Sequence, residues 1–369
     1  MRKTITKAQL CTTHAVRKNA NLNPKGLKHM ETRKSLSLLF VRPRAYFVLA
    51  LLGMLLGGLL DGGALHAGTQ APARTSTQAQ AVKQQTFATP QEAVQALVEA
   101  SKVKDQAALT KIFGPDSDKL FSGDPVEDNK DLEDFAAAAQ ESLQLQKDDD
   151  SKYTLLIGKD NWPTPIPIVQ KDGQWFFDTK AGLDEVLNRR IGENELSATT
   201  TCRAYVVAQW EYFTGGDWGH DGVAAYAPRF ISSPGAHDGL YWETPEDDKP
   251  SPLGQLVAEA RAEGYGPKDQ VAGGSKHERH PYHGYYFKIL TQQGPHAPGG
   301  KYNYIINGNM IAGFALVAYP DKWGDSGVMT FIVNQQGRLY EKNLGENTAK
   351  IAGTMTEYNP EPSWTLVKP

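Results

Sequence analysis

The chain has 369 residues, of which 40% are hydrophobic and 22% charged, and these values are ordinary for a globular protein long enough for two domains. Its charge is divided unevenly, because residues 1–67 hold 11 of the 39 basic residues and two of the 42 acidic ones. Residues 68–369 therefore carry 28 basic and 40 acidic side chains, a net charge of −12, which disfavours binding to nucleic acid or to anionic lipid.

The basic N-terminal region ends in an uncharged apolar run from Ala45 to Leu60, AYFVLALLGMLLGGLL, and small residues follow around Ala64 to Gly68. As a helix this run would be about 24 Å long, shorter than the roughly 30 Å hydrocarbon core of a membrane. We therefore expect residues 1–67 to be a cleavable signal region, and the mature chain to be periplasmic or secreted, with no permanent membrane anchor. Met30 is an alternative start, because the segment that follows it contains a complete signal of this kind.

Residues 68–86 are rich in Ala, Gln, Thr and Ser and are predicted to form a flexible linker. Order is expected from residue 87, where Thr89, Pro90 and Glu92 form a capping box that begins a helix over residues 90–103. A short helix capped by Asp105 and a third over residues 132–143 are predicted next.

Residues 153–158 are predicted to form a strand, and residues 165–170 and 174–178 a hairpin around the turn Asp172-Gly173. The sequence thus predicts an α+β domain over residues 87–180, with its helices first and a curved antiparallel sheet after them.

The second predicted domain, residues 181–369, opens with a long helix over about residues 182–213, whose apolar positions recur at i+3 and i+4. A shorter helix is expected over residues 253–263. Four strands should then form an antiparallel meander; they are expected over residues 284–290, 313–319, 327–334 and 338–341.

Two family resemblances bear on this organisation. Ala208-Gln209-Trp210-Glu211-Tyr212, Gly284-Tyr285-Tyr286-Phe287 and Phe331-Ile332-Val333-Asn334 resemble the soluble domain of type IV pilins and pseudopilins. This resemblance implies one long helix packed on an antiparallel meander. Pilins place that helix directly after a membrane span, whereas here a whole predicted domain lies between, so only the fold is implied.

The wider resemblance covers residues 87–369 and is to a family of exported bacterial proteins known only as a domain of unknown function. The segments that carry it include Trp175-Phe176-Phe177-Asp178-Thr179, residues 189–195 (RRIGENE), residues 281–287 (PYHGYYF) and Tyr358-Asn359-Pro360. It implies an exported protein and no particular activity.

Three imidazoles, His277, His280 and His283, are the sharpest candidates for a metal site, because neutral imidazole is a common ligand of zinc and copper. Pro281 argues against a helix that would align them. The alternative is a solvated turn before a strand.

Arg189 and Arg190, with Glu193 and Glu195 one turn later, form a charged group on the long helix where the two predicted domains join. They are candidates for an inter-domain contact, or else for ordinary pairing on a helix surface.

No complete catalytic set is recognisable. Cys202 falls on the apolar face of the long helix, where a thiol is expected to be inert, and Ser326 lies in a Gly-Asp-Ser-Gly segment without the other sequence features of a serine protease. No cofactor is predicted. The sequence therefore favours a non-enzymatic binding or structural module that contacts an envelope protein or polymer. The alternatives are a metal-dependent hydrolase using the three histidines, and a pilus or secretion-system accessory protein.

Overall fold

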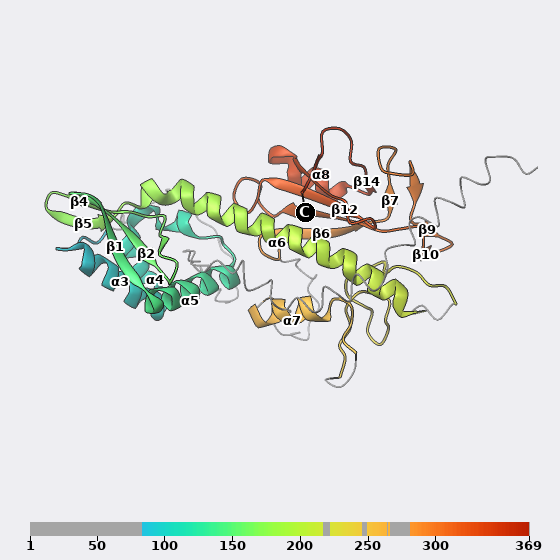
Figure 1. The fold of residues 1–369 in the computed structure, drawn as a ribbon, viewed down its shortest axis with the longest axis horizontal. Helices are drawn as coiled ribbons and strands as arrows, with labels where there is room; N and C mark the ends of the chain where they lie inside the picture. The colour runs from blue at the N-terminus through green and yellow to red at the C-terminus, as the bar shows by residue number, and fades with distance from the viewer. Residues whose placement is uncertain (1–82, 217–221, 246–248, 264, 266–280, 369) are drawn as a thin grey trace, which may run out of the picture. The chain divides into compact units, whose positions relative to one another are not determined.

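The computed structural model describes residues 83–216, 222–245, 249–263, 265 and 281–368 (Figure 1). The predicted signal region, nearly all of the predicted linker, His277 and His280 lie outside this range. No helix within it is long and apolar enough to cross a membrane.

The described chain begins with helices. Helix α3 (Pro90–Lys102) starts as predicted, with the Thr89 hydroxyl accepting a hydrogen bond from the Glu92 amide at 3.2 Å. Asp105 caps α4 (Gln106–Phe113), which leads into a 3-10 helix, η2 (Gly114–Leu120). Helix α5 (Pro125–Glu141) begins seven residues before the predicted start at 132, because Asp124 caps it and Pro125 occupies its first turn.

A five-stranded antiparallel sheet follows, in the order β1-β2-β4-β5 with β3 beside β2. The predicted strand and hairpin are confirmed, and the turn between β4 and β5 has positive φ at both Asp172 (54°) and Gly173 (76°), as a type I′ turn requires. Strand β1 was not predicted. The strands are β1 (Leu143–Asp149), β2 (Lys152–Ile157), β3 (Trp162–Pro163), β4 (Ile168–Lys171) and β5 (Gln174–Phe177).

The long helix α6 (Thr179–Gly215) has 37 residues and begins three residues before its predicted start. Asp178 caps it, accepting a hydrogen bond from the Ala181 amide at 3.2 Å. The shorter predicted helix is α7 (Gly254–Glu263).

The main C-terminal sheet is antiparallel throughout, in the order β15-β13-β12-β11-β6. Its strands β6, β11, β12 and β13 are the four predicted ones, and α6 lies alongside β11 and β12 (Figure 1). They are β6 (Tyr285–Leu290), β11 (Ala315–Pro320), β12 (Met329–Asn334), β13 (Leu339–Asn343) and β15 (Thr365–Leu366).

The connection from β6 to β11 is longer than a meander turn and carries short strands of its own. One three-stranded sheet includes a parallel pair, β14 with β7, which the predicted antiparallel meander did not anticipate. The remaining elements are β7 (Gln292–Gln293), β8 (Tyr302–Asn303), β9 (Ile305–Ile306), β10 (Asn309–Met310), η3 (Gly345–Asn347), α8 (Thr348–Thr354) and β14 (Glu357–Tyr358).

The described residues hold two hydrophobic cores, one between residues 87 and 186 and the other between residues 198 and 358. Helix α6 contributes to both, with Val186 in the first core and Ala198, Cys202 and Tyr205 in the second. The fold is therefore α+β, as predicted. The domain division at 180/181 stays a prediction, and residues 180 and 181 both lie in the first turn of α6.

Candidate functional site

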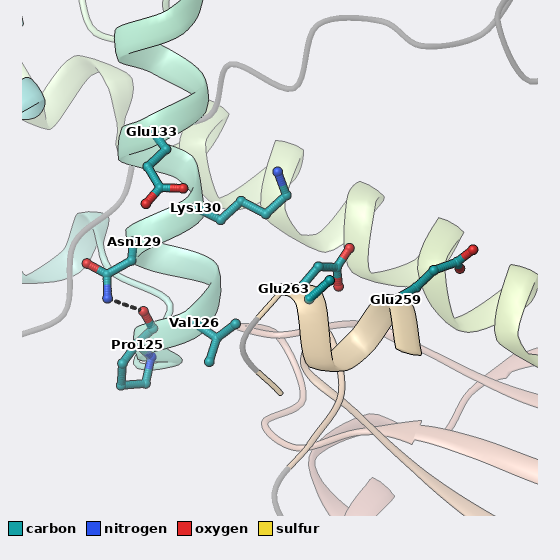
Figure 2. A pocket seen from close by; sticks show the side chains of 8 residues that line it. Pro125, Val126, Asn129, Lys130, Glu133, Glu259 and Glu263 are labelled. Atoms are coloured by element: carbon teal, nitrogen blue, oxygen red, sulfur yellow. Dashed lines mark hydrogen bonds between the residues drawn. The ribbon is translucent and has the colours of Figure 1, made fainter. Parts of the chain in front are cut away.

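A cleft of about 580 Å³ lies between α5 and α7 (Figure 2). One face of α5 lines one wall, since positions i, i+1, i+4, i+5 and i+8 share a side of a helix. The last turns of α7 line the other wall. The lining residues are Pro125, Val126, Asn129, Lys130 and Glu133 from α5, and Glu259, Ala262 and Glu263 from α7.

The charged side chains of this cleft are held by neighbours. The Lys130 ammonium lies 2.9 Å from the Asp134 carboxylate. Glu133 pairs with Lys104 at 2.6 Å, and the Glu263 carboxylate lies 3.0 Å from His283 Nε2. The cleft is therefore preformed, with three carboxylates and one compensated ammonium on its walls.

A second group of carboxylates lies on the neighbouring face of α5. Burial, and then the negative charges of Asp124 and Asp128, raise the pKa of Glu127 to about 8. Burial also raises the pKa of Asp128 to about 6, although hydrogen bonds from Ser122 oppose this shift. The pKa of Asp131 is likewise raised well above its usual range by burial and by the charge of Glu127. These groups share a region that is short of positive charge.

Arg190 lies next to these carboxylates and connects distant segments of the chain. Its guanidinium is buried, donating from Nη1 to Asp325 at 3.0 Å and from Nη2 to the Leu120 carbonyl at 2.8 Å. Its positive charge lowers the pKa of Glu127 and Asp128, in opposition to burial.

Further along α6, two side chains fix the segment that leads into β12. The Asn194 amide donates to the Ser326 carbonyl at 3.0 Å. One oxygen of Glu195 accepts hydrogen bonds from the amides of Val328 and Met329, at 3.0 and 2.9 Å. The charged motif of α6 thus binds η2 through Arg190 and the β12 approach through Arg190, Asn194 and Glu195.

The turn before β6 completes this region. His283 and Gly284 have φ values of 44° and 67°, so they occupy the two central positions of a type I′ turn between Tyr282 and Tyr285. A Cβ atom on Gly284 would lie 2.6 Å from the Asn194 side-chain nitrogen, so only glycine fits.

Tyr265 ties this turn to α5. Its ring contacts those of Tyr282 and His283, with centroids 5.1 and 5.3 Å away, and its hydroxyl donates to Asp124 at 2.9 Å.

The predicted inter-domain residues have different partners. Arg190 and Glu195 bridge segments distant in sequence, as described above. Arg189 instead pairs with Glu185 at 2.6 Å, donates to the Pro163 carbonyl and lies over the Trp162 ring. Glu193 is half-buried and adds its negative charge to the surroundings of Glu127 and Asp131.

The predicted metal site is described at one position only, His283, which the turn holds against Glu263. His277 and His280 lie outside the described residues, so the metal hypothesis stays a prediction. Within the described ranges, no group of three or more His, Cys, Asp and Glu side chains is placed to hold a metal ion.

Two residues weighed as nucleophiles have structural surroundings. Cys202 is fully buried, and this burial raises the pKa of its thiol to about 12. The Ser326 hydroxyl accepts from the Lys322 amide and donates to the Lys322 carbonyl, closing a turn.

Two further aromatic side chains, Trp242 and Trp323, have separate neighbours. Trp242 stacks on His237 in a smaller cleft, and Trp323 donates to Asn343.

Sequence reasoning missed the α5–α7 cleft and the contact between Tyr265 and Asp124. If the start of α5 had been placed at the Asp124-Pro125 cap, helical periodicity would have revealed the polar face of this helix. Nothing in the pattern of α7 shows that it faces α5, since the two helices are more than 110 residues apart.

Comparison with known proteins gives a family and no activity. No curated protein and no solved structure matches this chain significantly. A family model does match, over residues 84–367, which includes both hydrophobic cores and the whole of α6. The chain therefore belongs to the family described as "Protein of unknown function (DUF2950)".

Proposed function

We propose that this protein is an exported envelope protein that acts as a non-enzymatic binding module, with the α5–α7 cleft as its ligand site. The observation that carries the proposal is the cleft itself: a preformed hollow of about 580 Å³ that combines apolar and charged walls. Ligand sites of proteins commonly have this size and this mixture of surfaces.

Export is supported by the N-terminal sequence, where a basic segment precedes the uncharged run of residues 45–60. We place the mature protein in the periplasm or outside the cell. Fractionation of cells that produce the untagged chain, with N-terminal sequencing of the product, tests this placement. An intact N-terminus in the cytosolic fraction would contradict it.

We further propose that residues 181–369 adopt a pilin-like arrangement. The long helix beside an antiparallel sheet supports this, and the parallel pair β7–β14 and the preceding core depart from it. The resemblance to pilins concerns the fold alone, and we propose no role in filament assembly.

The binding role is tested by filling the cleft. Ala262 is exposed and lines it, so Ala262→Trp occludes the site without disturbing a core. Ala258→Trp is the matched control, because Ala258 is exposed on the same helix and outside the lining. Thermal-shift measurements with peptides, amines and oligosaccharides should find ligands that stabilise the wild type and the control but not Ala262→Trp. Ligands that stabilise all three proteins equally would contradict the role of the cleft, and turnover of any compound would contradict a non-enzymatic function.

A further inference from the structure

The α5–α7 cleft joins a short apolar surface to an excess of negative charge. Val126 and Ala262 provide apolar surface on opposite walls, while Glu133, Glu259 and Glu263 provide carboxylates. Figure 2 shows the side chains of Lys130, Glu263 and Glu259 around the space between the helices.

The single ammonium of the lining does not cancel this excess. Lys130 is paired with Asp134, which lies outside the lining, so its charge is already compensated. Glu133 and Glu263 also have partners outside the lining, Lys104 at 2.6 Å and His283 at 3.0 Å. Glu259 has a neutral partner, because it accepts a hydrogen bond from the side-chain amide of Gln255 at 2.9 Å. A ligand that enters the cleft therefore meets at least one carboxylate without a cationic partner in the described structure.

The adjacent face of α5 gives an independent indication of the same kind. Glu127 and Asp131 lie one helical turn apart. The charge of Glu127 makes ionisation of Asp131 less favourable, and the charge of Glu193 on α6 does the same for both. A positive charge brought near this part of α5 would relieve the repulsion, so the region favours a cationic ligand over a neutral or anionic one.

We propose that the cleft binds an aliphatic ammonium group, whose carbon stem lies on Val126 and Ala262 and whose head faces Glu259. This inference rests on the proposed binding function and names its ligand class. The group can come from a lysine side chain of a peptide or from a free diamine, since both offer the same chemistry.

Calorimetric titration of the purified protein tests the ligand class. The probes are the blocked peptide acetyl-Ala-Lys-Ala-amide, its Gln and Glu counterparts, and 1,5-diaminopentane. The Lys peptide, the diamine or both should bind, at least five-fold more tightly than the Gln peptide, and raising salt from about 20 to 500 mM should weaken the binding. The Lys peptide and the diamine separate the two sources of the ammonium group.

Two substitutions should act in opposite directions. Glu259→Gln removes a carboxylate and should weaken binding of the ammonium probes about two- to five-fold, as expected for an exposed charge pair. Lys130→Gln removes the competing ammonium and frees Asp134, so it should strengthen binding by a similar factor. Glu346→Gln is the matched control, because Glu346 is exposed in η3 and lies outside the cleft lining, and it should leave binding unchanged.

The outcomes separate this inference from the binding function on which it rests. If Gln and Lys peptides bind equally and Ala262→Trp abolishes both, the cleft binds ligands but the ammonium assignment is wrong. If Glu259→Gln and Lys130→Gln both bind the ammonium probes like the wild type, the assignment is also wrong. If Ala262→Trp leaves the binding of every probe unchanged, the binding function of the cleft fails as well.

Discussion

The Arg190 guanidinium lies 3.0 Å from the Asp325 carboxylate, although the two residues are 135 positions apart. Arg190 is 6% exposed and Asp325 42%, so the pair is buried on one side and open to solvent on the other. The other terminal nitrogen of Arg190 binds the Leu120 carbonyl, so one side chain holds η2, α6 and the approach to β12 together.

Arg190→Met should destabilise the protein by about 2 to 4 kcal/mol, because it leaves the Leu120 carbonyl and the Asp325 carboxylate without this partner. Urea unfolding measures the loss. Arg203→Met, at an exposed position of the same helix, should stay within about 0.5 kcal/mol of the wild type. An equal effect of both substitutions would show that Arg190 does not make these contacts in solution.

Gly284→Ala and Gly337→Ala form a matched pair. Comparing them separates the cost of backbone strain from the cost of a clash between the added Cβ atom and a neighbouring side chain. Their φ values are 67° and 69°, but an added Cβ meets Asn194 at 2.6 Å in the first case and nothing within 4 Å in the second. Gly337→Ala should cost about 1 kcal/mol from φ alone, and Gly284→Ala about 1 to 2 kcal/mol more. Equal losses in thermal unfolding would contradict the contact between the turn and α6.

Glu127→Gln should alter how stability depends on pH. The folded-state pKa of about 8 exceeds the ordinary value of 4.5, so the folded protein holds this proton more tightly than the unfolded chain does. The resulting stabilisation is complete below about pH 4.5 and is lost as pH rises through about 8.

A glutamine cannot ionise, so Glu127→Gln should match the wild type near pH 4 and exceed its stability by about 1 to 3 kcal/mol near pH 9. Denaturant unfolding across this range measures the difference, and Glu346→Gln should show none of it. A constant difference at all pH values would mean that Glu127 ionises as freely in the folded protein as in the unfolded chain.

Cys202 should not react with a thiol reagent in the folded protein. Its complete burial raises the thiol pKa to about 12, so almost no thiolate forms at neutral pH and no reagent reaches it. In a Cys11→Ser variant, Ellman's reagent should label less than one-tenth of the protein within an hour, and one thiol per chain after unfolding in urea. Rapid labelling of the native variant would contradict the placement of Cys202 in the core.

Local signals in the sequence were sufficient to predict most of the helices and strands. Thr89 and Asp178 begin helices through caps, and Asp172-Gly173 forms the turn of a hairpin. Strand β1 escaped prediction because its apolar alternation is limited to Leu143 and Leu145, and nearly all of its side chains are exposed. Helix α8 escaped for a similar reason, since only Thr348 and Ala352 are buried in it.

The candidate site was less accessible to sequence reasoning. Arg190 was singled out from its charge and from its place near a predicted boundary, and its contacts to Leu120 and Asp325 agree with a bridging position. Arg190 and Arg189 have different roles because they face different sides of α6, where adjacent residues differ by about 100° in direction. The cleft depends on tertiary packing that brings α5 against α7, and neither helix carries a pattern that specifies its partner.

Helix α6 also has a thermodynamic consequence. The N-terminal turns of α6 contribute to one core and its later turns to the other, so each core loses apolar packing when its part of the helix unfolds. The two cores should therefore melt as one cooperative unit instead of in sequence, and amide protons in the middle of α6 should exchange only when the whole molecule opens. A single secondary-structure element thus sets the size of the folding unit.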